Sequence, residues 1–275
     1  MGRSNSRRGG RLILAGIIVL VALISYWSMN TVNPVTGQSQ RVALSVDQEI
    51  ALGLQSAPQM AAEFGGLHPD AQAQALVDRV GERLLRAGFE EQLPYPFEFH
   101  LLADGQVVNA FALPGGQVFI TAALFQRLET EGQLAGVLGH EIGHVIERHG
   151  AEHLAKQQLT QGLIGAVAVG ASDPGSPIDP RQAAMLAGFI GQMVNLRYGR
   201  DDELESDAWG VTLLVDAGYD PRALIRVMDI LESASGGGGA PEFMSSHPDP
   251  GNRRERIRGL IEARFPEGVP ESLEP

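Results

Sequence analysis

Residues 137–146, with the sequence VLGHEIGHVI, carry the strongest chemical signal in the chain. His140 and His144 are four residues apart, so on a helix their side chains share one face, about one turn from each other. Two imidazoles at this spacing can bind one metal ion, and Glu141 beside them can act on water held by that ion. The neighbouring residues are apolar or glycine, and burying two histidines and a glutamate among them requires a compensating charge. A zinc ion would supply that charge.

The residues before the motif predict that it lies on a buried helix. Thr130 and Gln133 form a candidate capping box, and apolar residues follow them at helical spacing. The alternative is a pair of surface histidines beside a solvated glutamate, which the apolar flanks disfavour. We therefore expect His140 and His144 to be metal ligands and Glu141 to be catalytic.

The amino-terminal segment predicts a membrane anchor. Four arginines in the first eleven residues precede an apolar run that extends from Leu12 to Trp27 and, if two serines are tolerated, to Met29. Eighteen residues of helix span about 27 Å, close to the thickness of the hydrocarbon core of a bilayer. Basic residues before the run keep the amino terminus in the cytoplasm, and the remainder is exported. A cleaved signal peptide is the alternative, but the residues after Ile24 contain no small-x-small cleavage site, so we expect residues 1–29 to be a retained anchor.

The composition excludes several classes of protein. The 275 residues contain no cysteine, which rules out disulfide bonds and thiolate ligands for zinc. The 33 acidic residues outnumber the 21 basic ones, and the net charge is −12. Because a body this acidic offers no basic face to phosphates, we expect no nucleic acid as partner.

The rest of the chain divides into a linker, one domain and a tail. Residues 30–44 are rich in Asn, Pro, Gly, Ser and Gln, which is typical of a linker. A domain over residues 45–265 follows. Residues 266–275 contain three prolines and several acids, and they predict a disordered tail.

Within the domain, the pattern predicts both helices and strands. Two helices are expected over 45–56 and 69–87, followed by a strand over 97–102. Two β-rich runs on either side of Pro114-Gly115-Gly116 predict a hairpin over 107–121. The hairpin could hold an extended peptide along its edge, or it could simply be two strands of a sheet.

Two further apolar stretches, 159–171 and 183–196, follow the motif helix. Both are too short and too rich in glycine to cross a bilayer. We expect them to be helices in the core or over the active-site cleft.

A catalytic zinc ion needs a third protein ligand. One arrangement places a third histidine ten residues after the first, but Gly150 occupies that position here. His149 and His153 lie off the face that His140 and His144 share, so we predict them to be surface residues.

A separate helix over 201–215 offers a carboxylate instead. Glu203 and Asp207 lie one turn apart on a partly apolar face, whereas Glu205 lies about 200° round the helix from Glu203. Glu203 is therefore the candidate third ligand, and Asp207 can accept a hydrogen bond from a liganding imidazole. Without the upstream motif, the same pattern would fit two solvated acids favoured by the helix dipole.

Several separated motifs together resemble one family of zinc metallopeptidases. They are His140-Glu141-x-x-His144, Glu203-x-x-x-Asp207, Asn109-Ala110-Phe111 with Pro114-Gly115-Gly116, and Ser246-His247-Pro248 with Arg253. Over about residues 45–265, the chain resembles the family of HtpX, BepA and the CAAX prenyl proteases, and most of all its envelope-facing bacterial members with a soluble domain.

The resemblance implies an α+β fold: a mainly helical, zincin-like metalloprotease domain with a small β-sheet or hairpin, here preceded by one transmembrane helix. It implies one Zn²⁺ per chain, polypeptide substrates, and a catalytic domain on the periplasmic side of the bacterial inner membrane, carried by a single-pass anchor. It also implies that Arg253 and His247 stabilise the oxyanion, and that Asn109, Ala110 and Phe111 bind the substrate.

His247 has a second role that the resemblance suggests. It follows a glycine-rich segment, 235–239, which could let its loop move. A neutral imidazole could then reach the zinc ion as a fourth ligand and close the site. The simpler alternative is a surface His-Pro in a turn.

Three functions are compatible with these features. The first is a membrane-anchored zinc endopeptidase that cleaves misfolded or misassembled envelope proteins, with envelope assembly proteins as further partners. The second is a latent zinc-binding chaperone or assembly factor with little hydrolysis. The third is a hydrolase of small amides or peptides. A complete ligand set together with Glu141 favours an enzyme, because a purely structural zinc site does not need that glutamate.

Overall fold

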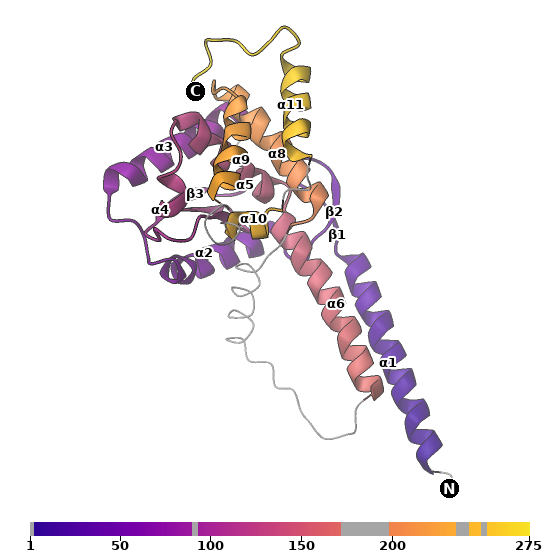
Figure 1. Ribbon diagram of the computed structural model, residues 1–275. Coiled ribbons are helices and arrows are strands. Elements are labelled where there is room, and N and C mark those ends of the chain that lie inside the picture. The colour runs from indigo at the N-terminus through magenta and orange to yellow at the C-terminus, as the bar shows by residue number, and fades with distance from the viewer. Residues whose placement is uncertain (1–2, 90–92, 172–197, 235–241, 249–251) are drawn as a thin grey trace.

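The computed structural model describes residues 3–89, 93–171, 198–234, 242–248 and 252–275. Figure 1 shows a globular body built mainly of helices, from which two long helices extend side by side. The helices are α1 (Arg3–Ser28), α2 (Val46–Glu63), α3 (Ala71–Gly88), α4 (Ala122–Phe125), α5 (Glu131–Ile146), α6 (His149–Ala171), α8 (Arg200–Asp216), α9 (Arg222–Ala234), α10 (Glu242–Ser246) and α11 (Arg253–Arg264). The strands are β1 (Asn30–Val32), β2 (Ser39–Arg41), β3 (Glu98–Leu102), β4 (Ala110–Leu113) and β5 (Gln117–Thr121).

Helix α5, which carries the HExxH motif, lies at the centre of the body. All of its residues from Gly132 to Ile146 are buried, and α3, α8 and α9 pack against it. Thr130 caps its start by accepting a hydrogen bond from the amide of Gln133, while the Gln133 side chain reaches the amide of Glu129. The predicted buried helix is confirmed. The capping box differs in one bond, because the Gln133 side chain accepts from the amide of Glu129 and not from that of Thr130.

Helix α8 approaches α5 closely because α5 has a glycine at the crossing. A Cβ atom added to Gly143 would lie 2.9 Å from the Cα atom of Ser206, closer than real Cβ contacts allow. Glycine therefore lets the two backbones come together. This crossing brings the start of α8, with its acids, next to the two histidines of α5.

A three-stranded sheet in the order β3-β5-β4 supports α5 from one side. Strand β4 pairs antiparallel with β5 through the turn Pro114-Gly115-Gly116, whose glycines have φ values of 90° and 103°. The predicted hairpin is thus confirmed. In the central strand, Val118 and Ile120 face the main core with α5, whereas Phe119 faces a second cluster with α2. The sheet consequently lies between α5 and α2.

The prediction of a linker over residues 30–44 is wrong. Strands β1 and β2 form an antiparallel hairpin there. The buried side chains of Asn33 and Gln40 donate hydrogen bonds to the carbonyl oxygens of Ile146 and Glu147. The segment therefore satisfies carbonyl groups at the end of the motif helix. The composition of a short polar sequence does not indicate this role.

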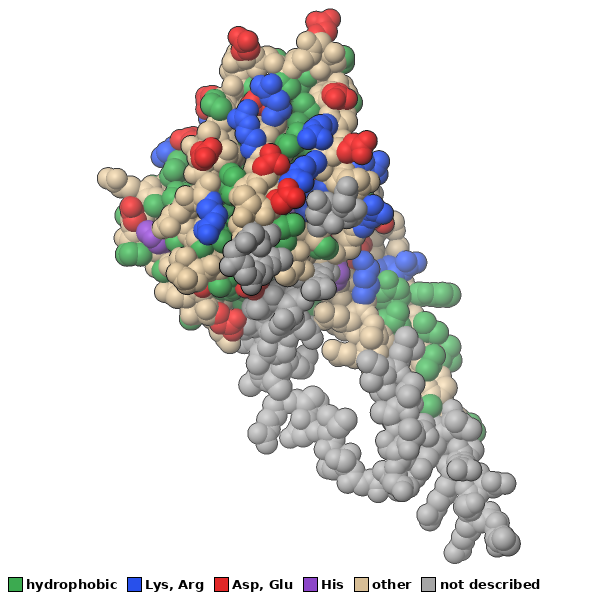
Figure 2. Space-filling model, in the orientation of Figure 1, with side chains coloured by type: hydrophobic (Ala, Val, Ile, Leu, Met, Phe, Trp, Pro, Cys, Tyr) green, Lys and Arg blue, Asp and Glu red, His purple; other side chains and the backbone are tan. Residues whose placement is uncertain are grey.

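The amino-terminal segment is helical, as predicted, but the structure gives no support to the prediction that it spans a membrane. None of the described helices is long and apolar enough to cross a membrane. Helix α1 packs along α6, and Figure 2 shows apolar side chains exposed along α1.

Two other expectations about the helices and the tail need revision. Residues 159–171 belong to α6, which runs alongside α1 away from the body rather than through the core (Figure 1). The stretch 183–196 lies outside the described residues. The predicted disordered tail is hydrogen-bonded to the body: Glu274 exchanges backbone hydrogen bonds with Gly218 and Asp220, and its side chain pairs with Arg83.

A buried ion pair holds the junction between α5 and α6. Arg148, which has a φ of 60°, donates from Nε to both carboxylate oxygens of Glu49 at 3.1 and 3.2 Å and from Nη2 to the carbonyl oxygen of Leu44. The Tyr95 hydroxyl donates to the same carboxylate at 3.0 Å. Burial raises the pKa of Glu49, and Arg148 opposes that rise. The cluster ties α2 to the end of the motif helix.

Replacing Arg148 with methionine should lower the free energy of unfolding by about 3–5 kcal/mol, because it leaves Glu49 buried without its counter-ion. Urea unfolding of the two proteins measures the difference. Lys156→Met is the matched control, because Lys156 and Glu152 form a half-exposed pair whose loss should change stability by about 1 kcal/mol or less. Equal losses for the two variants would contradict a structural role for the Arg148 cluster.

Candidate metal centre

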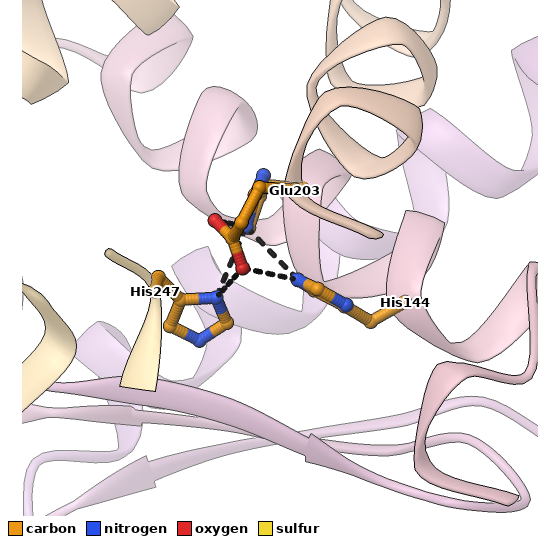
Figure 3. Close-up of side chains that lie close together, drawn as sticks. His144, Glu203 and His247 are labelled. Atoms are coloured by element: carbon orange, nitrogen blue, oxygen red, sulfur yellow. Dashed lines mark hydrogen bonds and ion pairs between the residues drawn. The ribbon is translucent and has the colours of Figure 1, made fainter. Parts of the chain in front are cut away.

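Four buried side chains from three parts of the chain converge beside the sheet. His140 and His144 come from α5, Glu203 from the first turn of α8, and His247 from the residue after α10. One ligand atom of each lies within 4.8 Å of the others. Figure 3 shows His144, Glu203 and His247 pointing toward one another. The first three are the ligands expected from the sequence, and His247 is the residue considered there as a possible fourth ligand.

Four of the distances between these atoms are close to those expected between the ligands of one tetrahedral ion. His140 Nε2 lies 3.1 Å from His144 Nε2 and 3.3 Å from His247 Nδ1. Glu203 Oε1 lies 3.0 Å from His247 Nδ1 and 3.5 Å from His144 Nε2. Ligands about 2.0–2.1 Å from a tetrahedral zinc ion lie about 3.3–3.4 Å from one another. Three imidazole nitrogens and a carboxylate oxygen are also ligands that zinc prefers, so the residues fit this ion.

Asp207 lies where the sequence predicted it, against the first histidine. Its Oδ1 is 3.0 Å from His140 Nδ1, which places the proton of this imidazole on Nδ1 and leaves Nε2 free to coordinate. Arg253 donates from Nε and Nη2 to the two oxygens of Asp207, at 2.8 and 2.7 Å. Burial works to raise the pKa of Asp207, but the hydrogen bonds and charge of Arg253 together with those of His140 outweigh it, and the pKa falls to about 2.

Arg253 also pairs with the carboxylate of Glu203. The distance from Arg253 Nη1 to Glu203 Oε2 is 2.7 Å, and both side chains are buried. Burial raises the pKa of Glu203, but His247, His140 and Arg253 together lower it below its usual value. Arg253 is therefore oriented toward two carboxylates of α8, and its Nη1 also donates to the carbonyl oxygen of His247 at 3.4 Å.

Glu141 lies next to the cluster and is completely buried. Neither of its carboxylate oxygens has a hydrogen-bond partner among the described residues. His247 Nε2 is 3.5 Å from its Oε1. Burial raises the pKa of Glu141, and the nearby His247 and His140 oppose the rise. A buried carboxylate with two unsatisfied oxygens can accept a proton readily.

Two residues at the centre escaped the sequence analysis. The buried Tyr198 stacks on His144, with ring centroids 3.8 Å apart. The prediction that His149 lies at the surface is wrong, since this residue is only 2% exposed and its Nδ1 is 2.9 Å from His144 Nδ1. His153 is partly exposed and pairs with Asp202. The spacing within one helix did not reveal His149, because α6 starts in a new direction after Arg148.

The predicted substrate-binding residues lie on and beside β4, outside the ligand cluster. Asn109 is buried, and its Oδ1 has no hydrogen-bond partner among the described residues. Ala110 is fully buried, and Phe111 stacks on Phe119 with centroids 4.9 Å apart. Just before β4, the carbonyl oxygen of Val108 accepts a hydrogen bond from the amide of Phe243 in α10, the helix that leads to His247. This edge of the sheet is thus joined directly to the element that supplies His247.

Comparison with known proteins identifies the family. The model of peptidase family M48 matches residues 71–261, which include all four side chains of the cluster. The chain belongs to this family. It is 33% identical to the beta-barrel assembly-enhancing protease of Yersinia pestis over 236 residues, covering 82% of this chain and 46% of that protein.

Two other relatives support the assignment. The beta-barrel assembly-enhancing protease of Escherichia coli K12 is 30% identical over 246 residues, with 83% of this chain and 48% of that protein covered. The mitochondrial metalloendopeptidase OMA1 of Bos taurus is 30% identical over 262 residues, with 88% and 48% covered. The M48 chain spans about half the length of these curated relatives.

Proposed function

We propose that this M48 peptidase holds its zinc ion with His140, His144 and Glu203 and uses Glu141 as the general base. The observation that supports the proposal is the convergence of four buried ligand atoms within 4.8 Å, with a buried, unsatisfied carboxylate beside them. Imidazoles and carboxylates are rarely buried together without a cation to compensate them.

The reaction we propose is hydrolysis of a peptide bond. Zinc, when bound, supplies a Lewis acid that acidifies water and polarises a carbonyl group. Glu141 takes a proton from the attacking water and returns it to the amine that leaves. Asp207 fixes the orientation of His140, and Arg253 fixes both Asp207 and Glu203. The substrate backbone would extend along β4, where Asn109 keeps an unsatisfied carbonyl oxygen.

The experiment that tests this function is cleavage of an unfolded protein such as casein by the zinc-loaded wild type and by Glu141→Gln. Cleavage by the wild type alone supports an endopeptidase. Equal cleavage by both proteins contradicts the assigned base. A protein that binds zinc but cleaves nothing in either form would instead be the chaperone or assembly factor that we hold as the alternative.

We further propose that His247 closes the site at rest. Its Nδ1 lies 3.0 Å from Glu203 Oε1 and 3.3 Å from His140 Nε2, which is the distance expected of a fourth ligand. In that arrangement the substrate carbonyl has no coordination position. The imidazole would therefore have to leave before a peptide binds.

His247→Ala is expected to raise the rate of casein cleavage. The increase should equal the inverse of the fraction of wild-type molecules in which His247 is away from the centre. Initial rates at equal zinc content measure it. A lower rate would assign His247 to the oxyanion instead, and an unchanged rate would exclude both roles.

We propose that the natural substrates are misfolded or misassembled proteins of the bacterial envelope. Two of the relatives are named as proteases that enhance β-barrel assembly. An unfolded chain also suits a peptidase whose substrate must add to the edge of a sheet in extended form. Envelope assembly proteins are the partners that this function would require.

A further inference from the structure

We propose that His149 and Glu205 position His144 for zinc through a chain of hydrogen bonds that ends at the protein surface. The proposal rests on His144 being a zinc ligand, as proposed above. It gives a role to a histidine and a glutamate that lie outside the ligand set.

The contacts form one continuous path. His149 Nδ1 lies 2.9 Å from His144 Nδ1, and His149 Nε2 lies 3.1 Å from Glu205 Oε2. The side chain of His149 is 2% exposed, whereas that of Glu205 is 50% exposed. The hydroxyl of Ser206 is also close, at 3.5 Å from His149 Nδ1. The path therefore runs from the buried centre to a carboxylate in contact with solvent.

The chemistry of imidazole sets the direction of each hydrogen bond. If His144 coordinates through Nε2, its proton is on Nδ1, and this N–H must donate. His149 Nδ1 then accepts, so the proton of the neutral His149 is on Nε2. That N–H donates to the carboxylate of Glu205. Every member has one donor facing one acceptor, and the negative charge of Glu205 strengthens the chain.

The two histidines of the motif thus have different supports. His140 donates directly to Asp207, a buried carboxylate fixed by Arg253. His144 reaches its carboxylate only through His149. Glu205 lies on a different side of α8 from Glu203, but it still serves the centre because α6 begins on that side. Helix α8 therefore supplies the proposed ligand, Glu203, and the two carboxylates that support the histidines: Asp207 for His140, and Glu205 for His144.

The junction before α6 makes this contact. Arg148, between the end of α5 and the start of α6, has a φ of 60°, a left-handed conformation that interrupts the helical path. Its guanidinium is held by Glu49, which fixes the turn. The next residue, His149, is consequently directed back toward His144 rather than outward along the first helix.

Zinc affinity, measured by competition with a chelator, tests the proposal without reference to activity. His149→Ala should weaken zinc binding by about 10- to 100-fold, the effect usual for loss of a group that orients a ligand. His149→Asn should restore part of the affinity, because its amide oxygen can accept from His144 Nδ1. Glu205→Ala should weaken binding less than His149→Ala does. The visible spectrum of the cobalt-substituted protein should shift for His149→Ala, because the geometry of the metal site changes.

His153→Ala is the matched control. His153 lies one turn further along α6 and pairs with another acid of α8, Asp202, at 3.0 Å. Its loss should leave zinc affinity and the cobalt spectrum unchanged. The proposal is overturned if His149→Ala binds zinc as tightly as the wild type. If His149→Ala does not fold, wild-type zinc affinity in both His149→Asn and Glu205→Ala overturns it. His144→Ala distinguishes a failure of the proposed ligand set from a failure of the role given to His149. If His144→Ala binds zinc as tightly as the wild type, the ligand set is wrong, whatever His149 does.

Discussion

Replacing Glu141 with glutamine is expected to abolish cleavage of unfolded protein while zinc remains bound. Glutamine has nearly the same shape as glutamate but cannot accept the proton of the attacking water, and a general base is worth about 10²- to 10⁴-fold in rate. Glu141 is not among the four candidate ligands, so the metal content should not change. Initial rates of casein cleavage and zinc content, measured on the same preparations, check the two halves of the expectation.

Glu147→Gln is the matched control for this variant. Glu147 lies at the end of the same helix and is also buried, but its Oε1 accepts a hydrogen bond from Trp209 Nε1 at 2.7 Å. A glutamine oxygen can accept the same bond, so the rate should stay at the wild-type value. If Glu147→Gln lost as much activity as Glu141→Gln, the loss would reflect a general effect on α5, and Glu141 would have no special place in the reaction.

The parts of the centre that the sequence predicted share one property: they follow from the geometry of a single helix. His140 and His144 lie on one face of α5, and Glu203 and Asp207 on one face of α8. Their periodicity fixes the direction of each side chain. That the two faces meet depends on Gly143, whose missing side chain permits the crossing. The sequence analysis expected this meeting only because a catalytic zinc ion needs a third ligand.

The parts that the sequence did not predict depend on the path of the chain between helices. His149 faces the centre because the helical path is interrupted at Arg148, and nothing in the local pattern indicates a positive φ at an arginine. The polar segment 30–44 looked like a linker, yet Asn33 and Gln40 are buried because they cap the end of α5. Composition describes how polar a segment is, but not which orphan carbonyl groups it will satisfy.

Arg253→Met should lower both the stability of the protein and its affinity for zinc. Arg253 is among the largest fully buried side chains and joins Glu203 to Asp207 at 2.7 Å each. Methionine would fill much of the space but leave two buried carboxylates without their cation, a change worth about 3–5 kcal/mol in the free energy of unfolding. Because Asp207 would no longer be held against His140, zinc affinity should fall about 10- to 100-fold.

The neighbouring arginine provides the control for this last variant. Arg254 pairs with Glu232 at 2.6 Å and Asp229 at 3.2 Å, both of which are largely exposed. Arg254→Met should therefore change the free energy of unfolding by about 1 kcal/mol or less and leave zinc binding intact. Urea unfolding of the metal-free proteins, followed by chelator competition, separates the two effects. A metal-free Arg253→Met protein as stable as Arg254→Met would mean that Glu203 and Asp207 do not need this cation, and it would favour the role in oxyanion stabilisation that the family resemblance suggested.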